Sequence, residues 1–187
     1  MLARRSFLIA CFALLSALAG HCASAATLDE YAVKAAYLYK LGSYVRWPAK
    51  DPPKVMTLVI WGDYPNEETL KSFAAAKING LPVQVVRIEK LEQAGIPQML
   101  FVAGETEADR ARLQAAVKKY RGQPVLILSD APTSVEDGAS VFLARVEETI
   151  KFELNVTAAT NAGLSFDARL QKIAYKLHRP TTMVGMP

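Results

Sequence analysis

Residues 99–130 read MLFVAGETEADRARLQAAVKKYRGQPVLILSD, and this stretch decides the fold class. It begins with an apolar run, Met99–Ala103, and ends with a second one, Val125–Leu128. Between them, small and apolar residues recur at helical spacing over Glu105–Tyr120. Short apolar runs bounded by glycine or proline are typical of buried strands. The stretch therefore predicts a strand, a helix and a strand, the unit from which parallel sheets are built.

The residues before this stretch repeat the same alternation. Two further apolar runs, Val55–Trp61 and Val83–Ile88, predict strands, and Asn66 is placed to cap a helix that runs to about Ala76. Asp29–Val45 is predicted to be a helix that ends before Trp47-Pro48, since proline disfavours helical geometry in the preceding residue. Four strands that alternate with helices predict a mostly parallel sheet with helices on both faces.

The residues after this stretch change the order of elements. Ala139–Val146 and Thr149–Asn155 predict two strands joined by a tight turn, with Val141, Leu143, Ile150, Phe152 and Leu154 on one face. Two helices follow, Val156–Ala162 and about Asp167–Leu177. The predicted fold is a three-layer α/β sandwich with a mixed, mostly parallel sheet, an antiparallel C-terminal hairpin at its edge, and terminal helices.

The first 26 residues are predicted to be a cleaved signal peptide. Arg4 and Arg5 precede an apolar run, Phe7–Leu18, and small residues lead to cleavage after Ala25 or Ala26. The apolar run is shorter than the roughly 20 residues that span a bilayer. A lipoprotein would need Cys22 directly after Gly20, but His21 intervenes. Residues 27–187 are therefore expected to form a single exported domain.

Composition excludes several classes of function. Without Arg4 and Arg5 the formal charge falls from +4 to +2, which is too mild for a nucleic-acid partner. Both cysteines precede the expected cleavage site, so the mature chain has no thiol and a single histidine, His178, expected to be exposed in a basic tail. Zinc sites need three or four nitrogen or sulfur ligands, which one histidine and no thiol cannot supply. We therefore expect no metal, and we also expect no cofactor and no catalytic triad.

Carboxylates follow the predicted parallel strands at the edge where such sheets usually bind ligands. Asp63, Glu105 and Asp130 make this rim acidic, which disfavours a phosphate site. Asp63 and Asp130 could form the acid–base pair of a hydrolase, or the three could gather a hard cation. The favoured interpretation is that these side chains cap turns and helices.

Several motifs carry a resemblance to a known family. They are YAVKAAYLY at 31–39, VRWP at 45–48, PVLILSD at 124–130, and FELN at 152–155 followed by Ala158-Ala159 and Ala162-Gly163-Leu164. Together they resemble the YfiR family over nearly the whole mature chain. Ile60 and Gln98 stand where members of that family often carry cysteine, so disulfide tuning is not expected here.

The resemblance implies a non-enzymatic regulator in the periplasm. It implies repression of an inner-membrane diguanylate cyclase through that enzyme's periplasmic domain, and so control of cyclic di-GMP and biofilm formation. It also implies a homodimer and release by an outer-membrane lipoprotein that binds peptidoglycan. The alternative is a periplasmic small-ligand sensor that acts on a membrane receptor or sensor kinase.

Five residues are candidates for partner binding. They are Glu153 and Asn155 on the last predicted strand, Arg169 on the last helix, and Tyr37 and Tyr44 on one face of the first helix. Four of them have an internal alternative: Asn155 can cap the following helix, Glu153 can pair with Lys151 or Arg145, and the two tyrosines can pack against the sheet. Aromatic side chains and paired charges are also frequent in protein interfaces.

Overall fold

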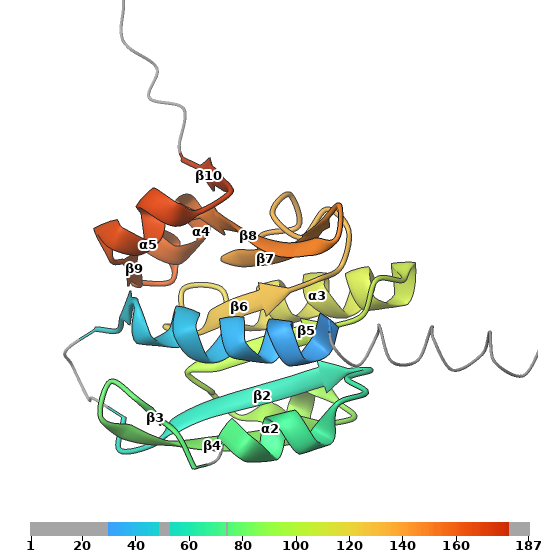
Figure 1. The fold of residues 1–187 in the computed structure, drawn as a ribbon, viewed down its shortest axis with the longest axis vertical. Coiled ribbons are helices and arrows are strands. Elements are labelled where there is room, and N and C mark those ends of the chain that lie inside the picture. The colour runs from blue at the N-terminus through green and yellow to red at the C-terminus, as the bar shows by residue number, and fades with distance from the viewer. Residues whose placement is uncertain (1–29, 49–52, 74, 180–187) are drawn as a thin grey trace, which may run out of the picture.

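A computed structural model describes residues 30–48, 53–73 and 75–179 (Figure 1). The predicted signal peptide lies outside the described residues. A first helix covers residues 30–43. The later helices are α2 (Glu67–Phe73), the 3-10 helix η1 (Leu91–Ala94), α3 (Glu107–Lys119), α4 (Val156–Asn161) and α5 (Ala168–Ile173). The strands are β1 (Val45–Arg46), β2 (Met56–Gly62), β3 (Lys77–Ile78), β4 (Leu81–Ile88), β5 (Met99–Ala103), β6 (Leu126–Ser129), β7 (Val141–Val146), β8 (Thr149–Asn155), β9 (Ser165–Phe166) and β10 (Lys176–His178).

Eight of these strands form one sheet in the order β10-β8-β7-β6-β5-β2-β4-β3. The four predicted strands, β2, β4, β5 and β6, are parallel neighbours, and β7 continues this parallel set. The pairs β7–β8 and β3–β4 are antiparallel. β1 and β9 form a separate antiparallel pair. The prediction of a mixed, mostly parallel sheet is confirmed.

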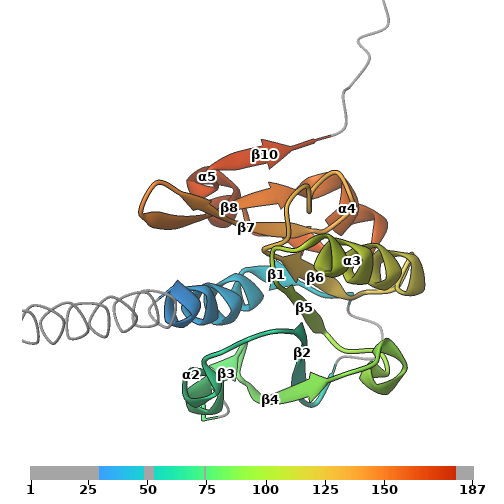
Figure 2. The same cartoon turned by 90° about the vertical axis from the view of Figure 1, so that its right-hand side faces the viewer.

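The central parallel strands, β2, β5 and β6, are buried on both faces, which makes the fold a three-layer one. On β2, Leu58 and Ile60 belong to a core shared with the first helix, while Val59 and Trp61 belong to a second core shared with α3. The first helix and α3 lie on opposite sides of the sheet, and the sheet curls between them (Figures 1 and 2). These continuous apolar runs are typical of parallel strands covered on both sides.

The predicted hairpin forms with its apolar face inward, since Ile150, Phe152 and Leu154 are buried on β8. However, the prediction that this hairpin is the edge of the sheet is wrong. β10 pairs in parallel with β8 and becomes the outermost strand on that side.

Two predicted helix ends are also wrong, and long-range strand pairing explains both. The first helix ends at residue 43, because Val45 pairs with Phe166 of β9. The last helix ends at Ile173, and the chain turns extended at Ala174 so that Tyr175 N–H donates to the Phe152 carbonyl. Neither partner strand is near in sequence, so helical periodicity did not reveal the change.

Candidate functional site

The carboxyl ends of β2, β5 and β6 are covered by the first helix. Strand connections reverse direction between β2 and β5, and at such a switch point doubly wound sheets usually bind ligands. Here Lys34 of the helix fills that position, with an exposed fraction of 1%. Its Nζ lies 2.6 Å from Asp130 Oδ2, and Asp130 Oδ1 accepts a hydrogen bond from Gly104 N–H at 2.8 Å. A built-in cation therefore neutralises Asp130, the buried member of the acidic rim.

Further contacts hold the same helical turn in place. Lys34 Nζ also lies 2.7 Å from Glu30 Oε1, and Arg145 of β7 binds Glu30 at 2.8 Å. Burial alone would lower the pKa of Lys34, but its contacts with Asp130 and, to a smaller extent, Glu30 and Tyr31 together outweigh burial and raise it. Lys34 Nζ sits 4.5 Å from the ring centroid of Tyr31. Burial, with Asp130 next in importance, raises the pKa of Tyr31 to about 12.

The acidic rim thus has different roles at its three positions. Asp130 is buried and ion-paired, Glu105 is exposed and 3.6 Å from Lys34 Nζ, and Asp63 is exposed. A carboxylate neutralised by a buried ammonium is poorly placed to act as a general base. Within residues 30–48, 53–73 and 75–179, no group of three or more metal-ligating side chains could hold an ion. In the same residues, no helix has both the length and the hydropathy of a membrane span.

Three of the five candidate residues make contacts inside the domain. The Tyr37 hydroxyl donates to the Ile150 carbonyl, and its ring lies 5.7 Å from that of Phe152. Asn155 caps α4, as predicted, by accepting from Ala158 N–H.

Glu153 does not pair with Lys151 or Arg145, so that predicted pairing is wrong. Its Oε2 lies 2.6 Å from His178 Nε2 and 4.0 Å from Lys176 Nζ, because β10 is aligned beside β8. The same pairing makes His178 half-buried, which corrects its predicted place in an exposed tail.

The other two candidates meet at the surface. The Arg169 guanidinium is largely exposed and lies 5.3 Å from the ring centroid of Tyr44, while its Nε donates to Asp167 Oδ1 at 3.0 Å. This hydrogen bond lowers the pKa of Asp167 to about 2. The structure therefore brings Tyr44, in the turn after the first helix, together with Arg169 of α5, whereas Glu153 and Asn155 lie on β8.

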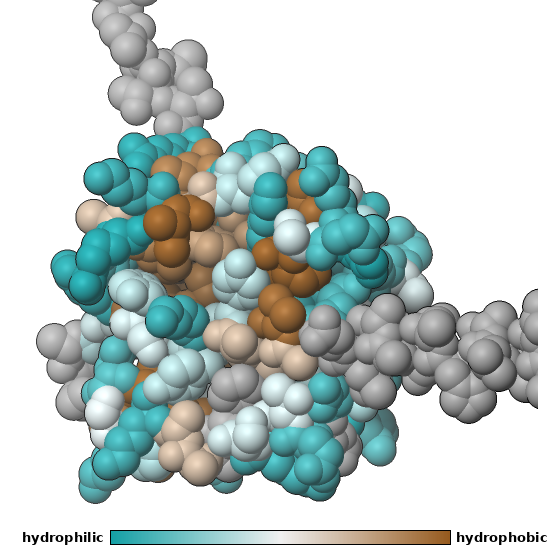
Figure 3. Space-filling view, viewed as in Figure 1, coloured by the Kyte–Doolittle hydropathy of each residue, from teal (hydrophilic) through white to brown (hydrophobic). Residues whose placement is uncertain are grey.

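Sequence reasoning missed an apolar feature next to Arg169. Ile173 is 68% exposed and Tyr175 is 53% exposed, and Lys151 Nζ lies 4.9 Å from the Tyr175 ring centroid. We call Arg169, Lys172, Ile173, Tyr175 and Lys176 the α5–β10 surface. Figure 3 shows apolar surface gathered over α5 and again beside the first helix. Helical spacing alone placed Ile173 inside a longer helix, so its exposure could not be read from the sequence.

Comparison with solved structures supports the fold. The chain resembles an ABC domain in complex with L-Trp from Streptococcus pneumonia, at 12% identity and a TM-score of 0.53, covering 79% of this chain and 60% of that one. A conserved domain protein from Vibrio cholerae O1 biovar El Tor matches at 14% identity and a TM-score of 0.46, covering 65% and 54%. The chain thus spans less than two thirds of either structure.

Comparison of sequences identifies the family. No curated protein matches the chain. Residues 31–175, however, match the YfiR/HmsC-like family, and this match includes the first helix, every strand of the parallel set, and the hairpin. The chain therefore belongs to the YfiR/HmsC-like family, a non-catalytic family of periplasmic regulators of cyclic di-GMP signalling.

Proposed function

We propose that this protein represses an inner-membrane diguanylate cyclase by binding its periplasmic domain, and so lowers cyclic di-GMP and biofilm formation. The α5–β10 surface (Figure 3) is the observation that supports contact, because apolar surface that is gathered in one place and rimmed by polar side chains is typical of interaction sites, whereas a single exposed apolar residue is common. Ile173 and Tyr175 contribute that apolar surface. The switch point of the sheet is filled by Lys34, which favours action by binding over turnover.

The charges around the apolar pair indicate the chemistry of the partner. Between residues 167 and 179 the positive side chains are Arg169, Lys172, Lys176 and Arg179, against the single carboxylate of Asp167. An interface of this kind pairs best with an apolar centre rimmed by acidic side chains, since complementary charge sets orientation and speeds encounter. The proposed partner surface is therefore acidic.

The candidate residues divide between contact and support. Arg169 would contact the partner, and Tyr44 lies beneath its guanidinium. Glu153 holds β10 against β8 through His178, Asn155 caps the helix that leads to α5, and Tyr37 ties the first helix to the hairpin. The proposal extends to a homodimer and to release by an outer-membrane lipoprotein that binds peptidoglycan, as the family resemblance implies.

A membrane pull-down with tagged residues 27–187 tests the proposal. We expect recovery of a membrane protein that carries a cyclase domain, and lower cellular cyclic di-GMP when the protein is present. Ile173→Asp should abolish both effects, because a buried, unpaired carboxylate at an interface is costly. Ile96→Asp is the matched control, since Ile96 is 67% exposed but lies in the loop before β5.

Two results would contradict the proposal. If no cyclase is retained and cyclic di-GMP does not change, repression is wrong. If a cyclase is retained equally by Ile173→Asp and by wild type, the repressor function stands but the α5–β10 surface is not the contact.

A further inference from the structure

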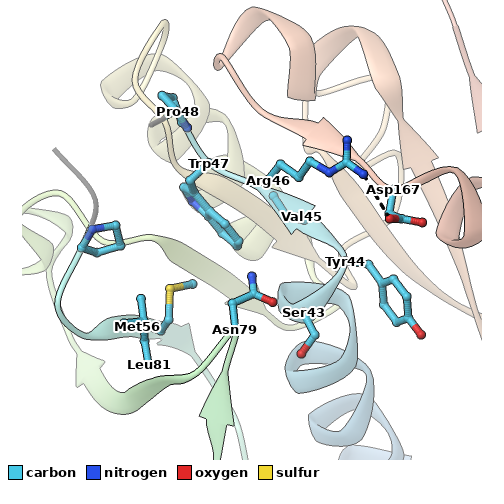
Figure 4. A pocket seen from close by; sticks show the side chains of 11 residues that line it. Ser43, Tyr44, Val45, Arg46, Trp47, Pro48, Met56, Asn79, Leu81 and Asp167 are labelled. Atoms are coloured by element: carbon cyan, nitrogen blue, oxygen red, sulfur yellow. Dashed lines mark hydrogen bonds and ion pairs between the residues drawn. The ribbon is translucent and has the colours of Figure 1, made fainter. Parts of the chain in front are cut away.

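Asp167 joins three parts of the fold at the start of α5. Its backbone N–H donates to the Tyr44 carbonyl, in the turn after the first helix, at 2.9 Å. Its carboxylate contacts Arg46 of β1 at 3.4 Å and Arg169 of α5 at 3.0 Å. Figure 4 shows Arg46 extending from β1 to Asp167, with Tyr44 nearby. The side chain of Asp167 is only 17% exposed, so these neighbours cover most of it.

Contacts on two sides hold Arg169 in one orientation. Its Nε donates to Asp167 Oδ1 at 3.0 Å and its Nη2 donates to Oδ2 at 3.3 Å, so the guanidinium meets the carboxylate through two hydrogen bonds. The guanidinium carbon also lies 5.3 Å from the ring centroid of Tyr44. Surface ion pairs add little to stability, but a two-point contact of this kind fixes geometry. Asp167 therefore orients a side chain that is itself 79% exposed.

The helix α5 has few other anchors on the domain. It is six residues long, and of these six residues, all of which the structure describes, Leu170 is the one that is buried. Asp167 caps the helix, because its Oδ1 accepts a hydrogen bond from Arg169 N–H at 2.9 Å. The direction of α5, and with it the position of Ile173 at its end, therefore depends on Asp167 as well as on Leu170.

We propose that Asp167 is a positioning residue for partner binding, which holds Arg169 and the start of α5 in the orientation that the α5–β10 surface presents. The inference rests on the proposed function, because it concerns the same contact. Asp167 does not touch the partner itself, since its oxygens are already occupied by two guanidinium groups and a backbone N–H. A partner that meets a guanidinium already held in place avoids the side-chain entropy that association otherwise costs.

The negative charge of Asp167 gives the proposal a sign that distinguishes it from simple charge attraction. Asp167 is the single carboxylate among residues 167–179, so charge alone predicts that its removal strengthens binding to an acidic partner. Positioning predicts the opposite: Asp167→Asn should weaken binding about two- to tenfold, the cost of immobilising one long side chain on association. Asparagine still accepts from Arg169 N–H as a helix cap, so the variant should keep the stability of α5.

Competition for the membrane partner measures this effect. Tagged wild-type protein is loaded with the cyclase-domain protein that it retains from solubilised membranes, and untagged variants are added until half of that protein is displaced. We expect half-displacement to need about two- to tenfold more Asp167→Asn than untagged wild type, at an unchanged melting temperature. Glu92→Gln, which removes an exposed carboxylate on η1, is the matched control and should compete like wild type.

Nuclear magnetic resonance tests the positioning without the partner. A hydrogen bond to a carboxylate slows exchange of an arginine Nε–H with water, and Arg169→Gln identifies the Arg169 signal by its loss. In Asp167→Asn this signal should exchange faster, whereas that of Arg110, which is held by Asp137, should not change.

Three outcomes are decisive. The inference is overturned if Asp167→Asn leaves the Arg169 signal unchanged. It is also overturned if wild type retains the cyclase-domain protein and Asp167→Asn competes for it as well as or better than wild type. If wild type itself retains no such protein, the proposed function is wrong and the role of Asp167 in binding is wrong with it.

Discussion

Replacing Lys34 by methionine should cost a large part of the stability of the domain. The change keeps an unbranched stem as far as Cε but removes the ammonium that lies 2.6 Å from Asp130 and 2.7 Å from Glu30. Asp130 then keeps its hydrogen bond from Gly104 but has no counter-ion in a fully buried position. Breaking a buried pair from one side costs about 3–5 kcal/mol. Domains of this size are stable by about 5–15 kcal/mol, so the loss is severe.

Urea unfolding followed by circular dichroism measures this loss. Lys40→Met is the matched control, because Lys40 is an exposed lysine on the same helix, and its substitution should change the free energy of unfolding by less than about 0.5 kcal/mol. The double variant Lys34→Met with Asp130→Asn removes both charges. It should recover part of the loss, with a coupling energy of about 2 kcal/mol in the double-mutant cycle.

Two outcomes would refute this reasoning. A Lys34→Met variant within about 1 kcal/mol of wild type would mean that water or a rearranged neighbour compensates the Asp130 carboxylate. Additive losses in the double variant would mean that the two residues stabilise the fold independently of each other.

Three further predictions follow from the described contacts. Asn155→Ala should lower the free energy of unfolding by about 1–2 kcal/mol in urea unfolding, because α4 loses its cap, whereas Asn155→Ser should retain most of it. Gly104→Ala should cost more than about 1 kcal/mol by the same assay, because Gly104 has a φ of +122° and an added Cβ would collide with the Asp109 carboxylate; equal stability would contradict the strain. Tyr31 binds its proton more tightly in the folded state, with a pKa raised from 10.0 to about 12, so the free energy of unfolding should fall as pH rises through that window. Melting temperatures at pH 9 and 11 check this, and Tyr31→Phe should show a smaller fall than wild type.

Local sequence signals were sufficient for most of the sheet. The runs at 99–103 and 125–128 became β5 and β6 within one residue at each end, because doubly buried strands have few polar residues to blur their limits. The caps at Asn66 and Asn155 could also be predicted, because each side chain accepts from a backbone N–H only three residues further along the chain. Features set by distant pairing were missed: β1, β9 and β10 are two or three residues long and exist through their partners.

The candidate site was predicted less well than the fold. The acidic rim was placed correctly at the strand ends, but the lysine that neutralises Asp130 was not foreseen. A signal was present, because Lys34, Leu38 and Leu41 are spaced four and three residues apart and share the buried face of the helix. A lysine on such a face needs a buried acid, and Asp130 was available. The exposure of Ile173 had no comparable signal, because it depends on where α5 stops.

The contacts of the first helix also set an order for folding. Lys34 contacts Asp130 across 96 residues and Tyr37 contacts the Ile150 carbonyl across 113, while Arg46 of β1, which follows the helix, contacts Asp167 across 121. The helix is synthesised early, but Lys34 and Tyr37 have no partners until the second half of the chain has been made. Closing such long loops costs chain entropy before these contacts can stabilise the fold, and this slows folding. Docking of the first helix is therefore expected to be a late step, and a chain cut before residue 130 would keep Lys34 on the apolar face of this helix without the acid that neutralises it.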